Sequence, residues 1–184
     1  MKLRLFYALW PPPEVRDALA AAARPLLDAC RGRRVPKRNY HLTLAFLGSV
    51  AEDRLPELRA AAAQVPFEPF TLRLDRHGYF KGARVAWLGC RQPPPAAAAL
   101  AEDLRAALVP LGFQPDPRPF RPHLTVLRNS PGCDWEGEIQ PVAWPVDGFM
   151  LARSETLPTG PVYHVVHRHP WPRNGTVSHG SAKT

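Results

Sequence analysis

The sequence predicts an α+β fold with two matching lobes. Strand-like and helix-like segments are interspersed without regular β-α-β alternation, and the short connections between them favour antiparallel sheets. A histidine–threonine element occurs twice, each time after a strand and a helix in comparable order, which indicates a pseudo-two-fold arrangement. The chain has 184 residues, of which 45% are hydrophobic, so it can bury the core of one ordinary domain.

The N-terminal elements follow from hydrophobic pattern and proline placement. Leu3–Trp10 is apolar and aromatic, as expected of a buried first strand. Prolines then precede an alanine-rich amphipathic helix that extends to about Cys30, in which Pro25 is a position for a kink or an early end. The next strand is expected from His41 to Leu47, where Gly48 stops it.

The remaining elements alternate between the two types. Gly78 and Gly82 are expected in the connection between a strand at Phe70–Asp75 and a strand at Arg84–Gly89, and residues 129–140 are expected in a loop. The predicted elements are a helix at Glu52–Gln64, strands at Phe70–Asp75 and Arg84–Gly89, a helix from Ala96 to about Leu111, and strands at His123–Arg128, Val146–Arg153 and Val162–Arg168. The 23 prolines gather ahead of the predicted helices and in the loops between predicted elements, not in the centres of predicted strands.

The positive charge is supplied almost entirely by arginine. The net charge is +8, and 20 of the 24 basic residues are arginines, whose planar guanidinium groups suit phosphate oxygens. Five basic residues lie within Arg31–Arg38, which is either a solvated loop or the mouth of a cleft that attracts an RNA backbone. Its position directly before the first histidine favours the second interpretation.

Cysteine and hydropathy patterns predict a soluble, cytoplasmic protein. Cys30, Cys90 and Cys133 are odd in number and widely spaced, so we expect packed or exposed thiols in a reducing compartment, not disulfides or a zinc site. No apolar run approaches the roughly 18 residues of a membrane span. A single domain is expected over residues 1–171, and a flexible polar tail over residues 172–184.

The doubled element carries the chemistry. His41-Leu42-Thr43-Leu44 is matched 82 residues later by His123-Leu124-Thr125-Val126, and a basic, proline-containing segment precedes each copy. In a strand, residues i and i+2 point to the same side, so each histidine shares a face with a threonine. Two histidines that titrate near neutrality and face one cleft can serve as general acid and general base without a metal. The substrate that suits such a pair is a phosphodiester.

These residues identify a resemblance. His41–Gly48 and Arg118–Arg128 are similar to the paired HxTx motifs of the two-histidine (2H) phosphoesterase superfamily, and in particular to its RNA 2',3'-cyclic phosphodiesterases, also called 2'-5' RNA ligases. The likeness extends over nearly the whole chain up to about Trp171. It implies a bilobal fold in which two antiparallel sheets line a central cleft and the helices pack outside. It also implies hydrolysis of RNA 2',3'-cyclic phosphate ends to 2'-phosphomonoesters, with possible reversal to ligation.

The resemblance also implies roles for individual residues. His41 corresponds to the proton donor and His123 to the proton acceptor, while Thr43 and Thr125 correspond to phosphate ligands. Arg128 matches an arginine near the phosphate, although strict strand alternation would turn it to the opposite face.

Substrate contacts are also expected from the segment before the second motif. Arg118 is a candidate substrate contact, and Phe120 either stacks on a base or packs in the core. No metal or cofactor is expected. The expected partner is an RNA with a cyclic phosphate end, tRNA halves being one possibility, and a monomer suffices because one chain supplies both motifs.

Two other functions are compatible with the sequence. The same site could act on a small cyclic nucleotide, such as an ADP-ribose cyclic phosphate. Alternatively, the chain could be a non-catalytic RNA-binding module, although a pure binder has no need of two titratable groups. His164, His167 and His169 cluster late in the chain, but no further ligands accompany them, so we expect surface histidines there.

Overall fold

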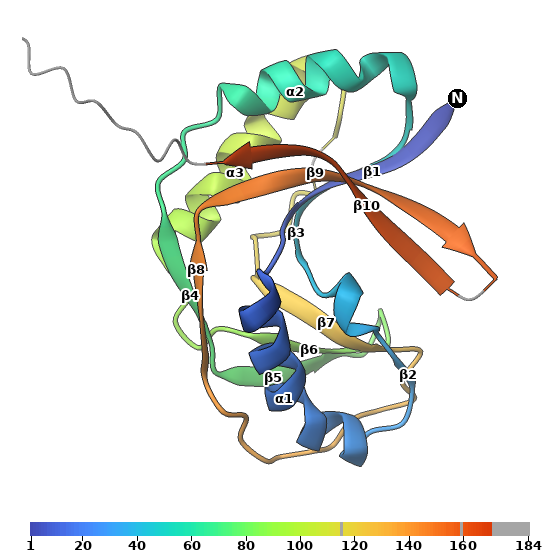
Figure 1. The fold of residues 1–184 in the computed structure, drawn as a ribbon, viewed down its shortest axis with the longest axis vertical. Coiled ribbons are helices and arrows are strands. Elements are labelled where there is room, and N and C mark those ends of the chain that lie inside the picture. Colours follow the sequence, from blue (N-terminus) through green and yellow to red (C-terminus); the bar gives the residue numbers. More distant parts are fainter. Residues whose placement is uncertain (115, 159, 171–184) are drawn as a thin grey trace, which may run out of the picture.

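The computed structural model describes residues 1–114, 116–158 and 160–170, and it shows the expected α+β architecture. The tail predicted over residues 172–184 lies outside the described residues. Ten strands and three α-helices occur in the described part of the chain (Figure 1). None of the helices described is both long and apolar enough to cross a bilayer.

Eight of the strands form one antiparallel sheet with the order β10-β9-β1-β3-β7-β6-β5, and β2 pairs with β7 beside this path. The strands of this sheet are β1 (Lys2–Leu9), β2 (Arg33–Arg34), β3 (Leu42–Ala51), β5 (Arg76–Phe80), β6 (Val85–Gly89), β7 (His123–Arg128), β9 (Gly148–Leu157) and β10 (Gly160–Pro170). A second sheet consists of β4 (Phe70–Leu74) and β8 (Val142–Val146).

The large sheet is divided in the middle. β3 and β7 are joined by a single residue pair, Leu42 opposite Leu124, whereas the neighbouring strands pair over many residues. The two sheets expected on either side of a cleft are therefore two halves of one sheet. One half contains β10, β9, β1 and β3, and the other contains β2, β7, β6 and β5.

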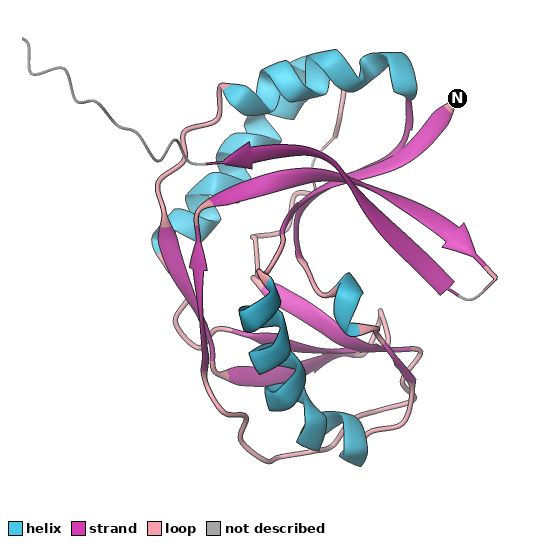
Figure 2. Ribbon diagram, in the orientation of Figure 1, coloured by secondary structure: helices cyan, strands magenta, loops and turns pink. Residues whose placement is uncertain are grey.

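The helices follow an approximate two-fold symmetry that relates the two halves of the sheet. α1 (Pro13–Ala29) follows β1 but packs against β7 and β8, and α3 (Pro95–Leu108) follows β6 but packs against β3 (Figures 1 and 2). Each of these two helices thus follows a strand of one half-sheet and packs against the other half-sheet. α2 (Leu55–Ala63) packs against α3 and β10.

Local chemistry accounts for the helices. Pro13 and Pro95 open α1 and α3, where a missing backbone N–H costs nothing. α1 buries Leu19, Leu26 and other apolar residues on one face, and it continues past Pro25 to Ala29. One hydrophobic core accepts residues from all three helices and both sheets.

Three strands were missed from the sequence. β5 occupies part of the segment expected as a connection, because Gly78 lies opposite Trp87 and leaves room for its indole ring. A Cβ at Gly78 would lie 2.2 Å from the Trp87 ring. β2 and β8 were also missed: β2 has only two residues, and β8 contains Pro145. The strand expected to end at Gly48 continues to Ala51, because a register shift against β1 accommodates the positive φ of this glycine.

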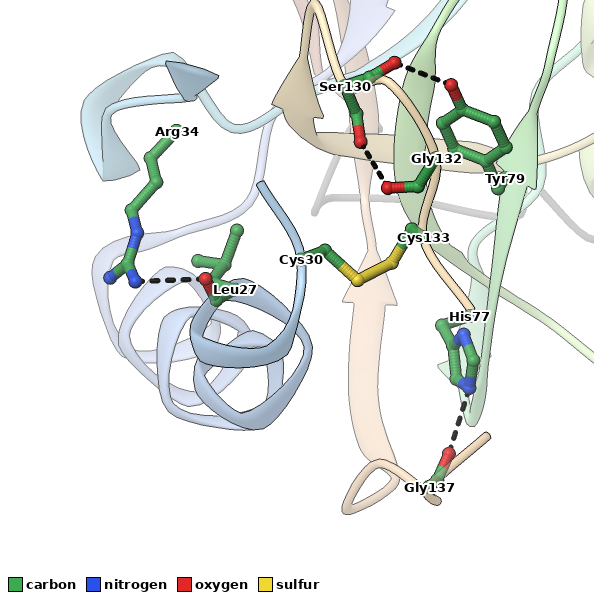
Figure 3. Close-up of a disulfide and its surroundings, with 9 residues drawn as sticks. All are labelled: Leu27, Cys30, Arg34, His77, Tyr79, Ser130, Gly132, Cys133 and Gly137. Atoms are coloured by element: carbon green, nitrogen blue, oxygen red, sulfur yellow. Dashed lines mark hydrogen bonds between the residues drawn. A yellow bond between two sulfur atoms is a disulfide. The ribbon is translucent and has the colours of Figure 1, made fainter. Parts of the chain in front are cut away.

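The expectation of three free thiols is wrong. Cys30, just after α1, forms a disulfide with Cys133 in the 129–140 loop, with 5.1 Å between their Cα atoms (Figure 3). Cys90 is free and buried. The two cysteines are 103 residues apart, so sequence spacing gave no sign of the bond. It also weakens the argument for a reducing compartment, since disulfides are rare there.

Hydrogen bonds hold the same loop against β5. The Tyr79 hydroxyl donates to the Ser130 carbonyl at 2.6 Å, and His77 Nε2 lies 2.8 Å from the Gly137 carbonyl (Figure 3). The Ser130 hydroxyl donates to the Gly132 carbonyl at 2.8 Å. The loop is thus attached on one side to α1 and on the other to β5.

The disulfide leads to a prediction about thiol number and stability. Unfolding the non-reduced protein in guanidinium should release one thiol that reacts with Ellman's reagent, whereas reduction should release three. Cys30→Ser should lower the free energy of unfolding by about 2–4 kcal/mol, because the bond closes a long loop in the unfolded chain.

Cys133→Ser should match Cys30→Ser, and a reductant should bring the wild type to the level of both variants. Three reactive thiols without reductant would contradict the bond.

Candidate active site

The β3–β7 junction brings the two motifs together. Leu42 lies opposite Leu124 in an antiparallel pair, so extending this register by one residue places His41 opposite Thr125 and Thr43 opposite His123. All four side chains line one cleft of about 1000 Å³ between the half-sheets. Their leucines, Leu42 and Leu124, point into the core, as the spacing predicted.

Both imidazoles are held in the same way. His41 Nδ1 lies 2.7 Å from the carbonyl oxygen of Asn39, and His123 Nδ1 lies 2.7 Å from that of Arg121. A carbonyl oxygen only accepts hydrogen bonds, so Nδ1 carries the proton in each ring. Nε2 is then the atom of each histidine that can take up or release a proton in the cleft.

His41 lies among aromatic rings. It stacks on Trp10 with the ring centroids 5.3 Å apart, and Tyr163 and Phe6 contact it with centroids at 4.9 and 5.0 Å. Burial there lowers the pKa of His41 to about 4, and the charges of Arg128 and His123 add to the lowering. The bond to the Asn39 carbonyl acts in the opposite direction. In the free protein His41 is therefore neutral near pH 7.

His123 has a similar but smaller aromatic surrounding. Phe80 meets its ring edge-on with centroids 5.1 Å apart, and Trp87 lies 6.4 Å away. Burial lowers the pKa of His123, Arg128 lowers it further, and the Arg121 carbonyl raises it. The two histidines thus share an orientation, a backbone acceptor and a direction of pKa shift.

A β-bulge turns Arg128 into the cleft. Ala86 pairs with Leu127 but Trp87 pairs with Thr125, so Val126 is an extra residue in β7. Val126 and Leu127 are consequently both buried, and Arg128 returns to the side of His123. The conflict between strict alternation and a phosphate contact is resolved by this one inserted residue.

The first motif has the matching irregularity. Tyr7 pairs with Ala45 but Ala8 pairs with Thr43, which leaves Leu44 as the extra residue of β3. Phe46, five residues after His41, therefore faces the cleft as Arg128 does five residues after His123. Phe46 is 55% exposed, an unusual position for a large apolar side chain.

The other two predicted residues lie at the cleft rim. Arg118 lines the cleft but forms an exposed ion pair with Asp116, including a 2.9 Å bond from Nε to Oδ1. Phe120 lines the cleft and also packs against the core, so its position is compatible both with stacking on a base and with packing in the core. The Arg105 guanidinium lies 5.9 Å from the centroid of the Phe120 ring.

Sequence reasoning missed the aromatic residues around the histidines. Trp10, Phe80, Trp87 and Tyr163 come from four different strands or strand ends, so no local spacing links them to the motifs. Phe46 could have been found by aligning the two motif copies beyond their fourth residue. Within the residues described, no group of three or more histidine, cysteine or acidic side chains could hold a metal ion.

Comparison with known proteins shows the family to which this chain belongs. The family described as LigT like Phosphoesterase matches residues 9–87 and 88–163. The chain is 34% identical over 163 residues to the RNA 2',3'-cyclic phosphodiesterase of Escherichia coli (strain K12), a match that covers 84% of this chain and 93% of the relative. It is 36% identical over 177 residues to the RNA 2',3'-cyclic phosphodiesterase of Thermus thermophilus, covering 90% and 89% of the two chains.

Solved structures show the same architecture. The crystal structure of E. coli LigT complexed with 3'-AMP superposes with a TM-score of 0.82 at 33% identity, covering 94% of this chain and 100% of the other. Sequence and structure agree over nearly the whole length of each protein. This chain therefore belongs to the LigT-like phosphoesterase family of the 2H superfamily.

Proposed function

We propose that the protein is a metal-independent phosphodiesterase that hydrolyses RNA 2',3'-cyclic phosphate ends to 2'-phosphomonoesters. The observation that carries the proposal is the pair of histidines with matched backbone acceptors, each with Nε2 free to act in one cleft. Relatives over most of the chain are named RNA 2',3'-cyclic phosphodiesterase.

The reaction follows from this geometry. The cyclic phosphate lies between the two Nε2 atoms, and a water attacks phosphorus in line with the 3' oxygen. One neutral imidazole accepts a proton from the water as the new P–O bond forms. The other histidine, as imidazolium, donates a proton to the 3' oxygen as the P–O3' bond breaks. The product carries a free 3' hydroxyl and a 2'-phosphate.

We assign proton donation to His41 and proton acceptance to His123. The aromatic rings around His41 disfavour its charged form, so its imidazolium is a strong acid suited to an alkoxide leaving group. A bound phosphate supplies the negative charge that this imidazolium requires. In the reverse, ligating direction the two roles exchange.

Thr43 and Thr125 act as hydrogen-bond donors to the non-bridging phosphate oxygens. Arg128 balances the charge that develops there, because the bulge in β7 turns it toward the histidines. Phe120 and Arg118 serve the substrate at the cleft rim, through stacking and charge respectively.

The biological setting forms part of the proposal. The chemistry fits RNA fragments that end in a cyclic phosphate, such as tRNA halves, and a cytoplasmic location. A monomer is sufficient because both motifs come from one chain. The disulfide is unusual for the cytoplasm, and thiol trapping in freshly lysed cells tests the location.

The proposed mechanism predicts the effect of removing each histidine. His41→Ala and His123→Ala should each lower the hydrolysis rate by about 10²–10⁴, because each removes a proton-transfer group. The assay follows a short RNA with a 2',3'-cyclic phosphate end by phosphorus NMR, with EDTA present. His164→Ala, outside the cleft, is the matched control. Full activity in both cleft variants, or a 3'-phosphate product, would refute the proposal.

A second prediction separates the acid from the base. A substrate with sulfur in place of the 3' bridging oxygen has a leaving group that needs no proton. It should restore much of the lost rate to His41→Ala and little to His123→Ala. The opposite pattern would exchange the two roles, and the ratio of rates on the sulfur and oxygen substrates measures this.

A third prediction concerns Arg128. Arg128→Gln should raise the pKa values of both His41 and His123, because the guanidinium charge lowers them in the wild type. The same variant should lose about 10²–10³ in rate. Histidine NMR titrations of the free protein give the pKa values, and Arg24→Gln on α1 is the control. Unchanged pKa values would place Arg128 away from the histidines.

A further inference from the structure

A second pocket opens from the catalytic cleft on its β9–β10 side. Its volume is about 490 Å³, within the range typical of ligand sites. It shares His41, Thr43 and Arg128 with the larger cleft, so the two cavities are continuous, and a ligand in this pocket would lie next to the reacting phosphate. We call it the arginine groove, after Arg4, Arg33 and Arg128 in its lining.

The charge of this groove is one-sided. Among the described residues that line it are those three arginines and no aspartate or glutamate. Within the described part of the chain, none of the three forms an ion pair with a carboxylate, whereas neighbouring Arg34 bonds Asp28 at 2.8 Å. Three uncompensated guanidinium groups in one concave surface provide a strong attraction for phosphate.

Strand register arranges the groove floor. Arg4 on β1 lies opposite Ser154 on β9, and Thr156 follows two residues later on the same face. These hydroxyls can donate to phosphate oxygens or bond a ribose 2' hydroxyl. The Arg4 guanidinium lies 5.0 Å from the centroid of the Phe46 ring, so this charge stands at the junction of groove and cleft.

The opposite wall comes from the basic run predicted at the cleft mouth. Arg33 on β2 pairs with Arg128 on β7, and its side chain extends toward the start of β10. A Cβ at Gly160 would lie 3.5 Å from Arg33 Nη1. The side chain of Arg33 thus reaches from β2, in the half-sheet of His123, to the start of β10, in the half-sheet of His41.

We propose that the arginine groove binds the sugar–phosphate backbone on the 5' side of the reactive RNA end. This rests on the proposed function. A nucleotide whose 3' oxygen is in the cyclic phosphate continues only in the 5' direction, so the remaining RNA leaves the site from there. The groove supplies cationic and hydroxyl groups for those phosphates, and a mononucleotide 2',3'-cyclic phosphate has none of them to offer.

The experiment compares two substrates in two charge-matched variants. Arg4→Gln/Arg33→Gln removes two groove charges, and Arg24→Gln/Arg59→Gln removes two exposed charges outside both pockets. The substrates are cytidine 2',3'-cyclic phosphate and an RNA tetranucleotide with the same end. kcat/KM is measured across salt concentrations, and melting temperatures confirm that each variant folds. Fluorescence anisotropy with a tetranucleotide 2'-phosphate measures binding independently of turnover.

The groove variant should lower the tetranucleotide-to-mononucleotide ratio of kcat/KM by about tenfold or more. Its salt slope on the tetranucleotide should fall by about 0.7 for each lost phosphate contact. The control variant should keep the wild-type ratio, and the single variant Arg33→Gln should show an intermediate loss.

Three results would overturn the inference. An equal loss on both substrates would mean that the groove holds the terminal nucleoside, and an equal loss in the control variant would mean general attraction by net charge. An unchanged ratio and unchanged binding would mean that RNA does not enter the groove. If the wild type hydrolyses neither substrate, the proposed function itself fails and the inference fails with it, a result distinct from the other three.

Discussion

One backbone pair, Leu42 with Leu124, determines the geometry of the whole site. Because only this pair joins β3 to β7, the two half-sheets can diverge on either side of it and leave a cleft. The same pair lies at the centre of the approximate two-fold relation between the motifs, so each histidine is opposite the threonine of the other copy. The helices reinforce the junction, since α1 and α3 each cross to the half-sheet formed by the other copy's strands. A shift of this register by one residue would turn one motif into the core.

Burial and hydrogen bonding have separate effects on the two histidines: burial changes the pKa, and the hydrogen bond selects the tautomer. Aromatic rings around each imidazole exclude water and disfavour the charged form, while the carbonyls of Asn39 and Arg121 fix Nδ1 as the protonated nitrogen. The ring environment makes each group sensitive to a nearby anion. The substrate phosphate can therefore contribute to setting the protonation states on which its own hydrolysis depends.

The arginines of this basic protein are distributed in two ways. Several form exposed ion pairs, as Arg34 does with Asp28 and as Arg118 does with Asp116 at the cleft rim, and such pairs contribute little stability. Arg4, Arg33 and Arg128 form no ion pair with a carboxylate among the described residues, and the described lining of their groove contains no acid. Three guanidinium groups without a described carboxylate partner thus lie together where a phosphate polymer would pass.

Local sequence patterns predict the α+β class, most of the elements, the doubled motif and a shared strand face for each histidine and its threonine. These depend on local periodicity, on proline placement and on repetition, all of which are visible in a linear string. The other features of the site depend on contacts between distant segments. The bulges that turn Phe46 and Arg128 into the cleft can be seen only in the pairing of β3 and β7 with their neighbouring strands. The Cys30–Cys133 bond joins residues 103 positions apart. The rings of Trp10, Phe80, Trp87 and Tyr163 reach the histidines from separate strands. Such contacts depend on how distant segments pair, and no local pattern encodes that pairing.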